Sequence, residues 1–228
     1  MLSAKHQRPR AFTLVEILVS IAIIGMLISI LAPGLAQSRN AARAIVCNNQ
    51  MRTLSQFASM YSDENRDLML RSQHSAFAAR CMPWGYALYE SFTGAVFDPA
   101  DSSAGWDVVF NGAYRCPIDR RKERWSYGYN VYFELTREET LGRTWTTRSN
   151  VPRPSATVLF GELLNTTSAD HAMAHFWTQY NAPPEIDPKR HGTTTGAAFL
   201  DGHASSVPFT TLFDRSTSTD SFNPQTAR

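Results

Sequence analysis

The sequence predicts an α+β protein in which one long N-terminal helix packs with its second half on a small head built around an antiparallel β-sheet. Three features lead to this class: an apolar run near the N-terminus, an amphipathic stripe directly after it, and short β-rich segments further along the chain. The chain has 228 residues, of which 43% are hydrophobic and 18% charged, so it is able to bury a core of its own. Glycine and proline number 12 each, which excludes a collagen-like chain.

The N-terminal segment has the layout of a membrane anchor. A basic leader, residues 1–11, carries three positive charges, Lys5, Arg8 and Arg10. Residues 12–33 follow as an apolar segment whose single charge is Glu16. A helix rises about 1.5 Å per residue, so this segment spans about 30 Å, the thickness of a bilayer core. The positive charges ahead of it predict a cytoplasmic N-terminus, with everything after the segment outside the cytoplasm.

An ordinary secretory signal peptide is the alternative for this segment. The apolar part of such a peptide has about 7–15 residues and precedes a cleavage site between small residues, whereas the present run is longer. A charge inside an apolar helix costs about 2.5–3.5 kcal/mol on insertion scales. Glu16 is therefore expected to have a partner or a task, which a plain anchor does not provide.

The same helix is expected to continue as an amphipathic segment, residues 34–67. Apolar residues recur there at spacings of three and four, which places them on one helical face: Cys47, Met51, Leu54, Ala58 and Tyr61. We expect this face to pack on the head, and we expect the helix to end near Ser62, before a polar loop at residues 63–67.

The head, residues 68–209, is predicted from short runs of β-branched and aromatic residues bounded by glycine, proline or asparagine. The expected strands are residues 108–110, 126–133, 156–161, 195–200 and 203–207. The last two flank Asp201-Gly202, a pair that favours a two-residue type I′ hairpin turn. One short helix is expected around residues 171–177. Residues 210–228, rich in serine and threonine, are expected to form a flexible tail.

Residues 10–16, Arg-Ala-Phe-Thr-Leu-Val-Glu, resemble the processing site of type IV pilins and type II secretion pseudopilins. The resemblance implies a pilin-like lollipop, cleavage between Ala11 and Phe12 by a prepilin peptidase on the cytoplasmic face, and N-methylation of the new Phe12 amine. It also implies that the apolar helix is kept in the mature protein, with a kink at Pro33. Ala11 stands where this family usually has glycine.

A second resemblance concerns the C-terminal part of the chain. His191, nine further residues and then Asp201-Gly202 are similar to a processing-associated motif near the C-terminus of many pseudopilin-like proteins. Residues 115–119, 126–130 and 157–162 fit the same group. No activity follows from this resemblance.

Assembly into a filament gives Glu16 a physical role. Subunit helices pack side by side in an apolar core, where the positive Phe12 amine is able to neutralise the Glu16 carboxylate. Correct pairing offsets the cost of burying both charges and mispairing does not, so the pair sets the register of an incoming subunit. The alternative is that Glu16 only reaches out to the lipid headgroups.

Residues of the head include one candidate metal site. His191, Asp201 and His203 form it, with Glu162 or Asp119 as a further ligand, because imidazole and carboxylate suit zinc. A structural role is preferred, in which Asp201 accepts backbone N–H bonds in the turn and His191 bonds across the hairpin. The sequence contains neither a Gly-x-Ser-x-Gly nor a His-Glu-x-x-His motif, so we expect no catalytic residue, no cofactor and no resident metal.

Three cysteines, Cys47, Cys81 and Cys116, follow the apolar segment and are expected outside the cytoplasm, where disulfides persist. Two pairings remain open, Cys47–Cys116 and Cys81–Cys116. The first is preferred since Cys47 lies on the stripe that faces the head. Unpaired buried thiols are the third possibility. Without a Cys-x-x-Cys pair, a redox or zinc role is not expected.

The sequence therefore predicts a structural, non-enzymatic pseudopilin-like subunit of a type II secretion or type IV pilus-like filament. It is expected in the inner membrane with a single span and a periplasmic head. The expected partners are a prepilin peptidase, other pilin or pseudopilin subunits, the inner-membrane assembly platform and the lipid bilayer. The net charge is only +2, which does not favour nucleic acid as a partner.

Two rival functions remain open. One is a minor pilin for adhesion or DNA uptake. The other is a membrane-tethered module that binds polysaccharide or another polymer and uses the pilin signal only for export. Exposed aromatic side chains over a groove would favour binding, whereas a buried set favours the structural role. The aromatic residues concerned are Trp84, Tyr86, Trp106, Trp125 and Trp177.

Overall fold

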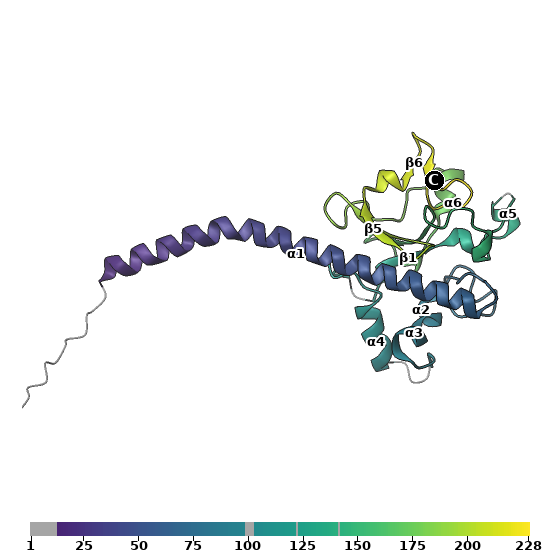
Figure 1. The fold of residues 1–228 in the computed structure, drawn as a ribbon, viewed down its shortest axis with the longest axis horizontal. Helices are drawn as coiled ribbons and strands as arrows, with labels where there is room; N and C mark the ends of the chain where they lie inside the picture. Colours follow the sequence, from purple (N-terminus) through teal and green to yellow (C-terminus); the bar gives the residue numbers. More distant parts are fainter. Residues whose placement is uncertain (1–12, 99–102, 122, 141) are drawn as a thin grey trace, which may run out of the picture. The chain divides into compact units, whose positions relative to one another are not determined.

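A computed structural model describes residues 13–98, 103–121, 123–140 and 142–228. The chain divides into two compact units, Met1–Ala41 and Ala42–Arg228. Helix α1 (Leu14–Glu64) has residues in both units. In its described part the first unit consists of this helix and the residue before it, whereas the second holds the remainder of α1 and the whole head (Figure 1).

Helix α1 confirms the expected long N-terminal helix, and its 51 residues include Pro33. Proline has no N–H, so the helix lacks one internal hydrogen bond at that point; the kink at Pro33 stays a prediction. Within the second unit the expected stripe faces inward, with Cys47, Met51 and Leu54 fully buried. The helix ends two residues later than Ser62, where we expected its end.

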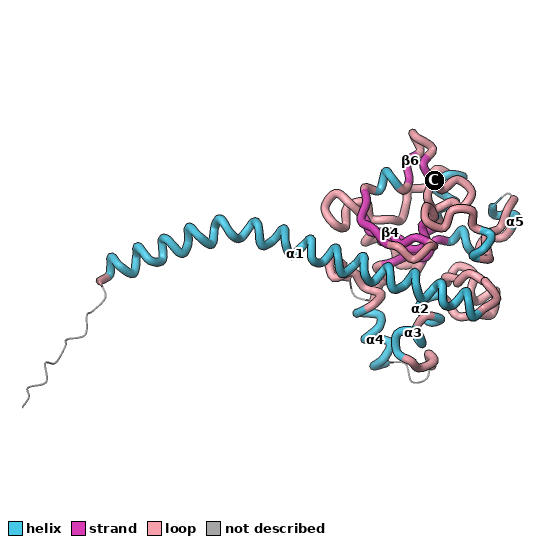
Figure 2. Tube along the Cα trace, viewed as in Figure 1, coloured by secondary structure: helices cyan, strands magenta, loops and turns pink. Residues whose placement is uncertain are grey.

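The remaining α-helices and strands of the described residues belong to the second unit, and Figure 2 distinguishes helix from strand by colour. In chain order they are α2 (Trp84–Ala87), α3 (Tyr89–Thr93), α4 (Ser103–Gly112), β1 (Tyr127–Asn130), α5 (Arg137–Thr140), β2 (Val158–Glu162), β3 (His171–Ala172), α6 (Ala174–Gln179), β4 (Thr195–Phe199), β5 (Ala204–Val207), β6 (Phe213–Asp214) and β7 (Thr219–Asp220).

The main sheet has the strand order β3-β1-β2-β4-β5, and β6 pairs with β7 in a separate small sheet. All neighbours in the main sheet run antiparallel except β1 and β3, which are parallel. The sheet is thus mixed rather than antiparallel throughout. The expectation was wrong at this point because β3 is only two residues long, in a segment without a period-two pattern. The α+β class itself is confirmed.

Two hydrogen bonds tie α1 to the hairpin side of the sheet. Ser55 Oγ donates to the Phe199 carbonyl at 2.5 Å. Asn48 Nδ2 donates to Ser206 Oγ at 2.9 Å. The amphipathic half of the helix is therefore bonded to β4 and β5, within the head on which we expected it to pack.

Strands β4 and β5 form the expected hairpin, with Thr195 opposite Val207 and Ala198 opposite Ala204. The type I′ turn was wrong. Gly202 has a φ of +95° whereas Asp201 has no positive φ, and a type I′ turn requires positive φ at both central residues. The Gly202 N–H instead bonds the Phe199 carbonyl at 3.1 Å, which makes a three-residue loop with the glycine in the left-handed position.

Residues 108–110, which we expected to form a strand, lie in helix α4. Val108 is 73% exposed while Val109 and Phe110 are buried, so the three residues do not alternate as in a strand. Trp106, Val109, Phe110 and Ala113 share one helical face, which packs on the core. A spacing of three and four across the longer segment outweighs the β-propensity of two adjacent valines.

The expectation of a flexible tail at residues 210–228 does not match the packing. Leu212, Phe213 and Phe222 are buried. Asn130 Nδ2 donates to the Phe222 carbonyl at 2.6 Å, and the Val158 N–H donates to the Ser221 carbonyl at 2.8 Å. Serine and threonine between these apolar residues made the segment look like a tail, yet its aromatic residues belong to the core.

Candidate functional site

The N-terminal signal falls partly outside the described residues, because Ala11 and Phe12, the predicted cleavage and methylation site, are not among them. Thr13 is described and directly precedes the first residue of α1. Its backbone N–H and its hydroxyl both donate to Glu16 Oε2 at 2.8 Å, and its Oγ1 accepts the Glu16 N–H at 3.3 Å. This reciprocal arrangement is a capping box, which satisfies N–H groups at the start of the helix.

The capping box gives Glu16 a task within a single chain. A carboxylate in the first turn is also favoured by the positive end of the helix dipole. Our sequence reasoning missed this role, although Thr-x-x-Glu ahead of an apolar run is a recognised signature of a helix N-terminus. The side chain of Glu16 is exposed, and its pairing with the Phe12 amine stays a prediction.

Among the described residues, α1 is long and apolar enough to cross a membrane by its length and composition. The large apolar side chains from Leu14 to Leu35 are all more than half exposed. Burying such side chains is worth about 1.5–3 kcal/mol each. Transfer of this part of the helix from water to an apolar environment, either lipid or other apolar helices, is therefore strongly favourable.

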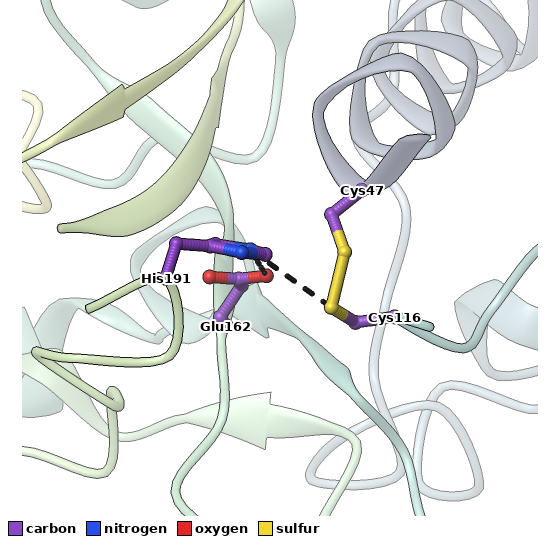
Figure 3. Close-up of side chains that lie close together, drawn as sticks. All are labelled: Cys47, Cys116, Glu162 and His191. Carbon is purple, nitrogen blue, oxygen red and sulfur yellow. Dashed lines mark hydrogen bonds and ion pairs between the residues drawn. A yellow bond between two sulfur atoms is a disulfide. The ribbon is translucent and has the colours of Figure 1, made fainter. Parts of the chain in front are cut away.

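Inside the head, four side chains from four segments meet in what we call the buried cluster (Figure 3). Cys47 comes from α1, Cys116 from the loop after α4, Glu162 from the end of β2 and His191 from the loop before β4. Cys47 and Cys116 form a disulfide, with their Cα atoms 5.1 Å apart. The Sγ, carboxylate and imidazole atoms that face one another all lie within 4.8 Å.

Glu162 and His191 form the polar half of the buried cluster. Glu162 is fully buried; its Oε1 lies 2.8 Å from His191 Nε2, and its Oε2 accepts the Gly196 N–H at 2.7 Å. His191 Nε2 also lies 3.9 Å from Cys116 Sγ. A Cβ at position 196 would lie 3.2 Å from Glu162 Cδ, so the bare glycine lets the carboxylate approach the strand. His191 Nδ1 is buried and has no hydrogen-bond partner among the described residues.

A charged network next to the buried cluster fixes two of its segments to each other. Arg190 Nη1 lies 3.1 Å from Asp119 Oδ2, and Arg121 Nη2 lies 2.7 Å from the same oxygen. Burial by itself raises the pKa of Asp119, but hydrogen bonds from Arg121 and Ser126 and the charge of Arg190 outweigh it, so the pKa lies below its usual range. The network joins the chain three residues after Cys116 to the residue before His191.

The structure does not bring His191 together with Asp201 and His203. His191 precedes β4 and contacts Glu162, whereas Asp201 and His203 lie beyond the other end of β4. There Asp201 Oδ1 bonds His203 Nδ1 at 2.6 Å and accepts the His203 N–H at 3.1 Å, as in the structural role preferred from the sequence. Gly202 supplies the left-handed turn position. The candidate site of these three ligands is therefore divided between two ends of one strand.

The other candidate residues have separate positions. Cys81 is unpaired and partly buried, so the alternative Cys81–Cys116 pairing is not the one present. Trp84, Trp125 and Trp177 are buried. Tyr86 and Trp106 are stacked with ring centroids 4.4 Å apart, and both are partly buried. The aromatic set thus belongs mainly to the interior of the head.

From the sequence, Glu162 was expected only as a possible ligand beside His191, and its meeting with the two cysteines was not predicted. No local motif signals such a cluster, because its members come from positions 47, 116, 162 and 191 of the chain. The preferred pairing of Cys47 with Cys116 is present, whereas the contact of this pair with Glu162 and His191 depends on tertiary packing.

Comparison with known proteins gives one match. A family model described as the prokaryotic N-terminal methylation motif matches residues 7–32. No curated protein and no solved structure matches the chain. The motif and the long apolar helix together indicate a type IV pilin-like signal, of the kind that a prepilin peptidase processes, on a chain compatible with single-pass anchoring in a membrane.

Proposed function

We propose that the protein is a structural, non-enzymatic pseudopilin-like subunit that assembles through its N-terminal helix into a filament of a type II secretion or type IV pilus-like apparatus. The observation that carries the proposal is the methylation motif at residues 7–32, which overlaps the start of a helix whose apolar side chains are exposed in the single chain. A filament core made of such helices would cover that surface.

The proposed sequence of events starts at the inner membrane. A prepilin peptidase removes residues 1–11 on the cytoplasmic face, and the new Phe12 amine is methylated. Lipid covers the apolar half of α1 until the subunit is added to a filament, where neighbouring helices replace lipid. The head remains outside the cytoplasm, and subunit addition at the base moves the filament.

Glu16 is proposed to select the register of each added subunit by pairing with a positive Phe12 amine. This role is compatible with the capping box, because an ionised carboxylate accepts several hydrogen bonds and Thr13 uses one oxygen. Two explanations for Glu16 therefore compete: charge pairing between subunits, and capping within one subunit. Both predict that removing the side chain is harmful.

Glu16→Gln separates these explanations, because glutamine is able to keep the capping box but carries no charge. We expect Glu16→Gln to be processed normally and to be lost from filaments, as measured by co-sedimentation and electron microscopy. Glu16→Ala should show the same loss, while Glu64→Gln, an exposed glutamate at the other end of α1, should assemble like the wild type. Normal assembly of Glu16→Gln would refute the charge-pairing role.

Mass spectrometry of the membrane-extracted protein tests the proposed processing directly. A methylated Phe12 as the N-terminal residue is the expected result. An intact Met1, or cleavage after Ala32, would identify an ordinary anchor or signal peptide and would refute the filament function.

The rival function as a tethered polymer-binding module depends on an exposed aromatic surface. Burial of Trp84, Trp125 and Trp177 favours the structural subunit instead, because these side chains serve the core. The same burial leaves a sugar ring no access to them.

A further inference from the structure

The buried cluster has a second chemical state that the proposed function does not use. Before the Cys47–Cys116 disulfide forms, both residues are thiols, and this state requires no reductant. These thiols would then lie beside the Glu162 carboxylate and the His191 imidazole. Two thiolates, one imidazole and one carboxylate form a donor set that suits four-coordinate zinc.

We propose that the reduced chain binds one Zn²⁺ through Cys47, Cys116, Glu162 and His191. The disulfide and the zinc site are alternative states, because the same two sulfur atoms either bond each other or bind the metal. On binding, the thiols release their protons to solvent and the sulfur atoms coordinate as thiolates. The proposal goes beyond the filament function and does not depend on it.

Two donor distances in the buried cluster lie close to those of a tetrahedral site, and the two sulfur atoms would have to separate once their bond is absent. Zinc binds sulfur at about 2.3 Å and nitrogen or oxygen at about 2.0–2.1 Å, so neighbouring donors in a tetrahedron lie about 3.3–3.8 Å apart. Cys116 Sγ lies 3.9 Å from His191 Nε2, and His191 Nε2 lies 2.8 Å from Glu162 Oε1. Shifts of well under 1 Å correct both distances. No hydrogen bond to His191 Nδ1 from the described residues opposes a small rotation of the ring.

The surroundings of these donors also suit a structural metal. Cys47, Cys116 and Glu162 are fully buried, and the His191 side chain is 2% exposed. Water therefore has little access to compete as a ligand, and structural zinc sites are closed in this way. Gly196 holds the Glu162 carboxylate by its N–H on the side away from His191, which orients one ligand before the metal arrives.

Zinc at this site would link the same segments in the reduced chain that the disulfide links in the oxidised chain. Either state joins α1 to the loop after α4, and zinc would add β2 and the loop before β4. The head would thus be held on the helix before oxidation. This set of ligands differs from the one considered from the sequence, since it includes neither Asp201 nor His203.

The test uses the full chain in detergent micelles, reduced with a phosphine under anaerobic conditions. Near-ultraviolet circular dichroism first establishes whether the reduced head is folded. Co²⁺ is then titrated as a spectroscopic probe and displaced with Zn²⁺. We expect one equivalent of Co²⁺ to produce thiolate charge-transfer bands and the visible bands of tetrahedral cobalt, and Zn²⁺ to remove them. The oxidised protein should produce neither.

Variants identify the ligands. Cys116→Ser, Glu162→Gln and His191→Gln should each weaken Zn²⁺ binding at least tenfold, the loss typical even for residues that only support a ligand. Cys81→Ser and His203→Gln are matched controls, because the first removes a thiol and the second an imidazole outside the buried cluster; both should bind like the wild type.

Three results would overturn the proposal. The first is a folded, reduced wild type without tetrahedral cobalt bands. The second is a reduced wild type that has lost its near-ultraviolet signal and does not regain it with Zn²⁺. The third is wild-type affinity in both Glu162→Gln and His191→Gln, or loss of binding in Cys81→Ser, since either would assign the metal to thiols alone or to another place.

Discussion

Loss of the Cys47–Cys116 disulfide should strongly lower the stability of the head. The bond joins residues separated by 69 positions in the chain. In the chain-entropy model a closed loop of this length lowers the entropy of the unfolded chain enough to stabilise the folded state by about 4 kcal/mol at 25 °C. We therefore expect the double variant Cys47→Ala/Cys116→Ala to lose about that much free energy of unfolding.

The assay is guanidinium unfolding of the full chain, followed by tryptophan fluorescence because Trp84 and Trp177 are fully buried. A chelator in the buffer keeps metal from contributing. Cys81→Ala, which removes an unpaired and partly buried thiol, is the control and should lose less than about 1 kcal/mol. A double variant whose free energy of unfolding lies within about 1 kcal/mol of the wild-type value would show that the disulfide does not constrain the loop as described. A loss in Cys81→Ala equal to that of the double variant would assign the effect to the packing of thiols.

Three further changes test the packing and titration of the head. Gly128→Ala would put a Cβ 2.4 Å from Leu163 Cδ2 and should lower the free energy of unfolding, measured by thermal unfolding, by about 1–3 kcal/mol. Gly112→Ala is the control, because its Cβ would meet nothing within 4 Å, and it should not lower stability. Equal losses in the two variants would contradict the packing described around Gly128. Phe222→Ala removes a ring that is 1% exposed and should cost about 3–5 kcal/mol in chemical unfolding, whereas a flexible tail would tolerate the change. Burial raises the pKa of Asp220 to about 6 from its ordinary 3.8, so the folded state holds this proton more tightly than the unfolded state. The stability that this protonated carboxyl contributes is complete below about pH 4 and is lost as the pH rises through about 6. Asp220→Asn should remove this part of the dependence of Tm on pH. A variant whose plot of Tm against pH runs parallel to that of the wild type would disprove the shift.

Local patterns predicted the elements in which one residue type repeats at a helical or strand period. The stripe through Cys47, Met51 and Leu54 is buried as expected, because spacings of three and four select one face of a helix whatever that face meets. The hairpin of β4 and β5 was also predicted, since two β-rich runs flank an Asp-Gly pair. Its turn type was not, because the type depends on the backbone angle of Asp201, which an adjacent glycine does not determine.

Segments with mixed signals were assigned wrongly. Val108 and Val109 favour a strand by composition, yet the longer pattern around them is helical and packs on the core. Residues 210–228 have the composition of a loose tail, yet Phe222 fills space next to Trp177, with ring centroids 4.8 Å apart. In both cases the decisive energy is burial of an aromatic or aliphatic side chain against residues far away in the chain, which no short window contains.

The sequence by itself determined the N-terminal signal and the helix that follows from it. A helix satisfies its backbone internally, so the motif at residues 7–32 and an apolar segment with Glu16 as its single charge are enough to indicate a pilin-type signal and a possible membrane span. The buried cluster was decided only by the tertiary structure. Cys47, Cys116, Glu162 and His191 become neighbours because α1, two loops and β2 pack together, and contacts between distant segments depend on how all of the core is filled at once rather than on any local sequence.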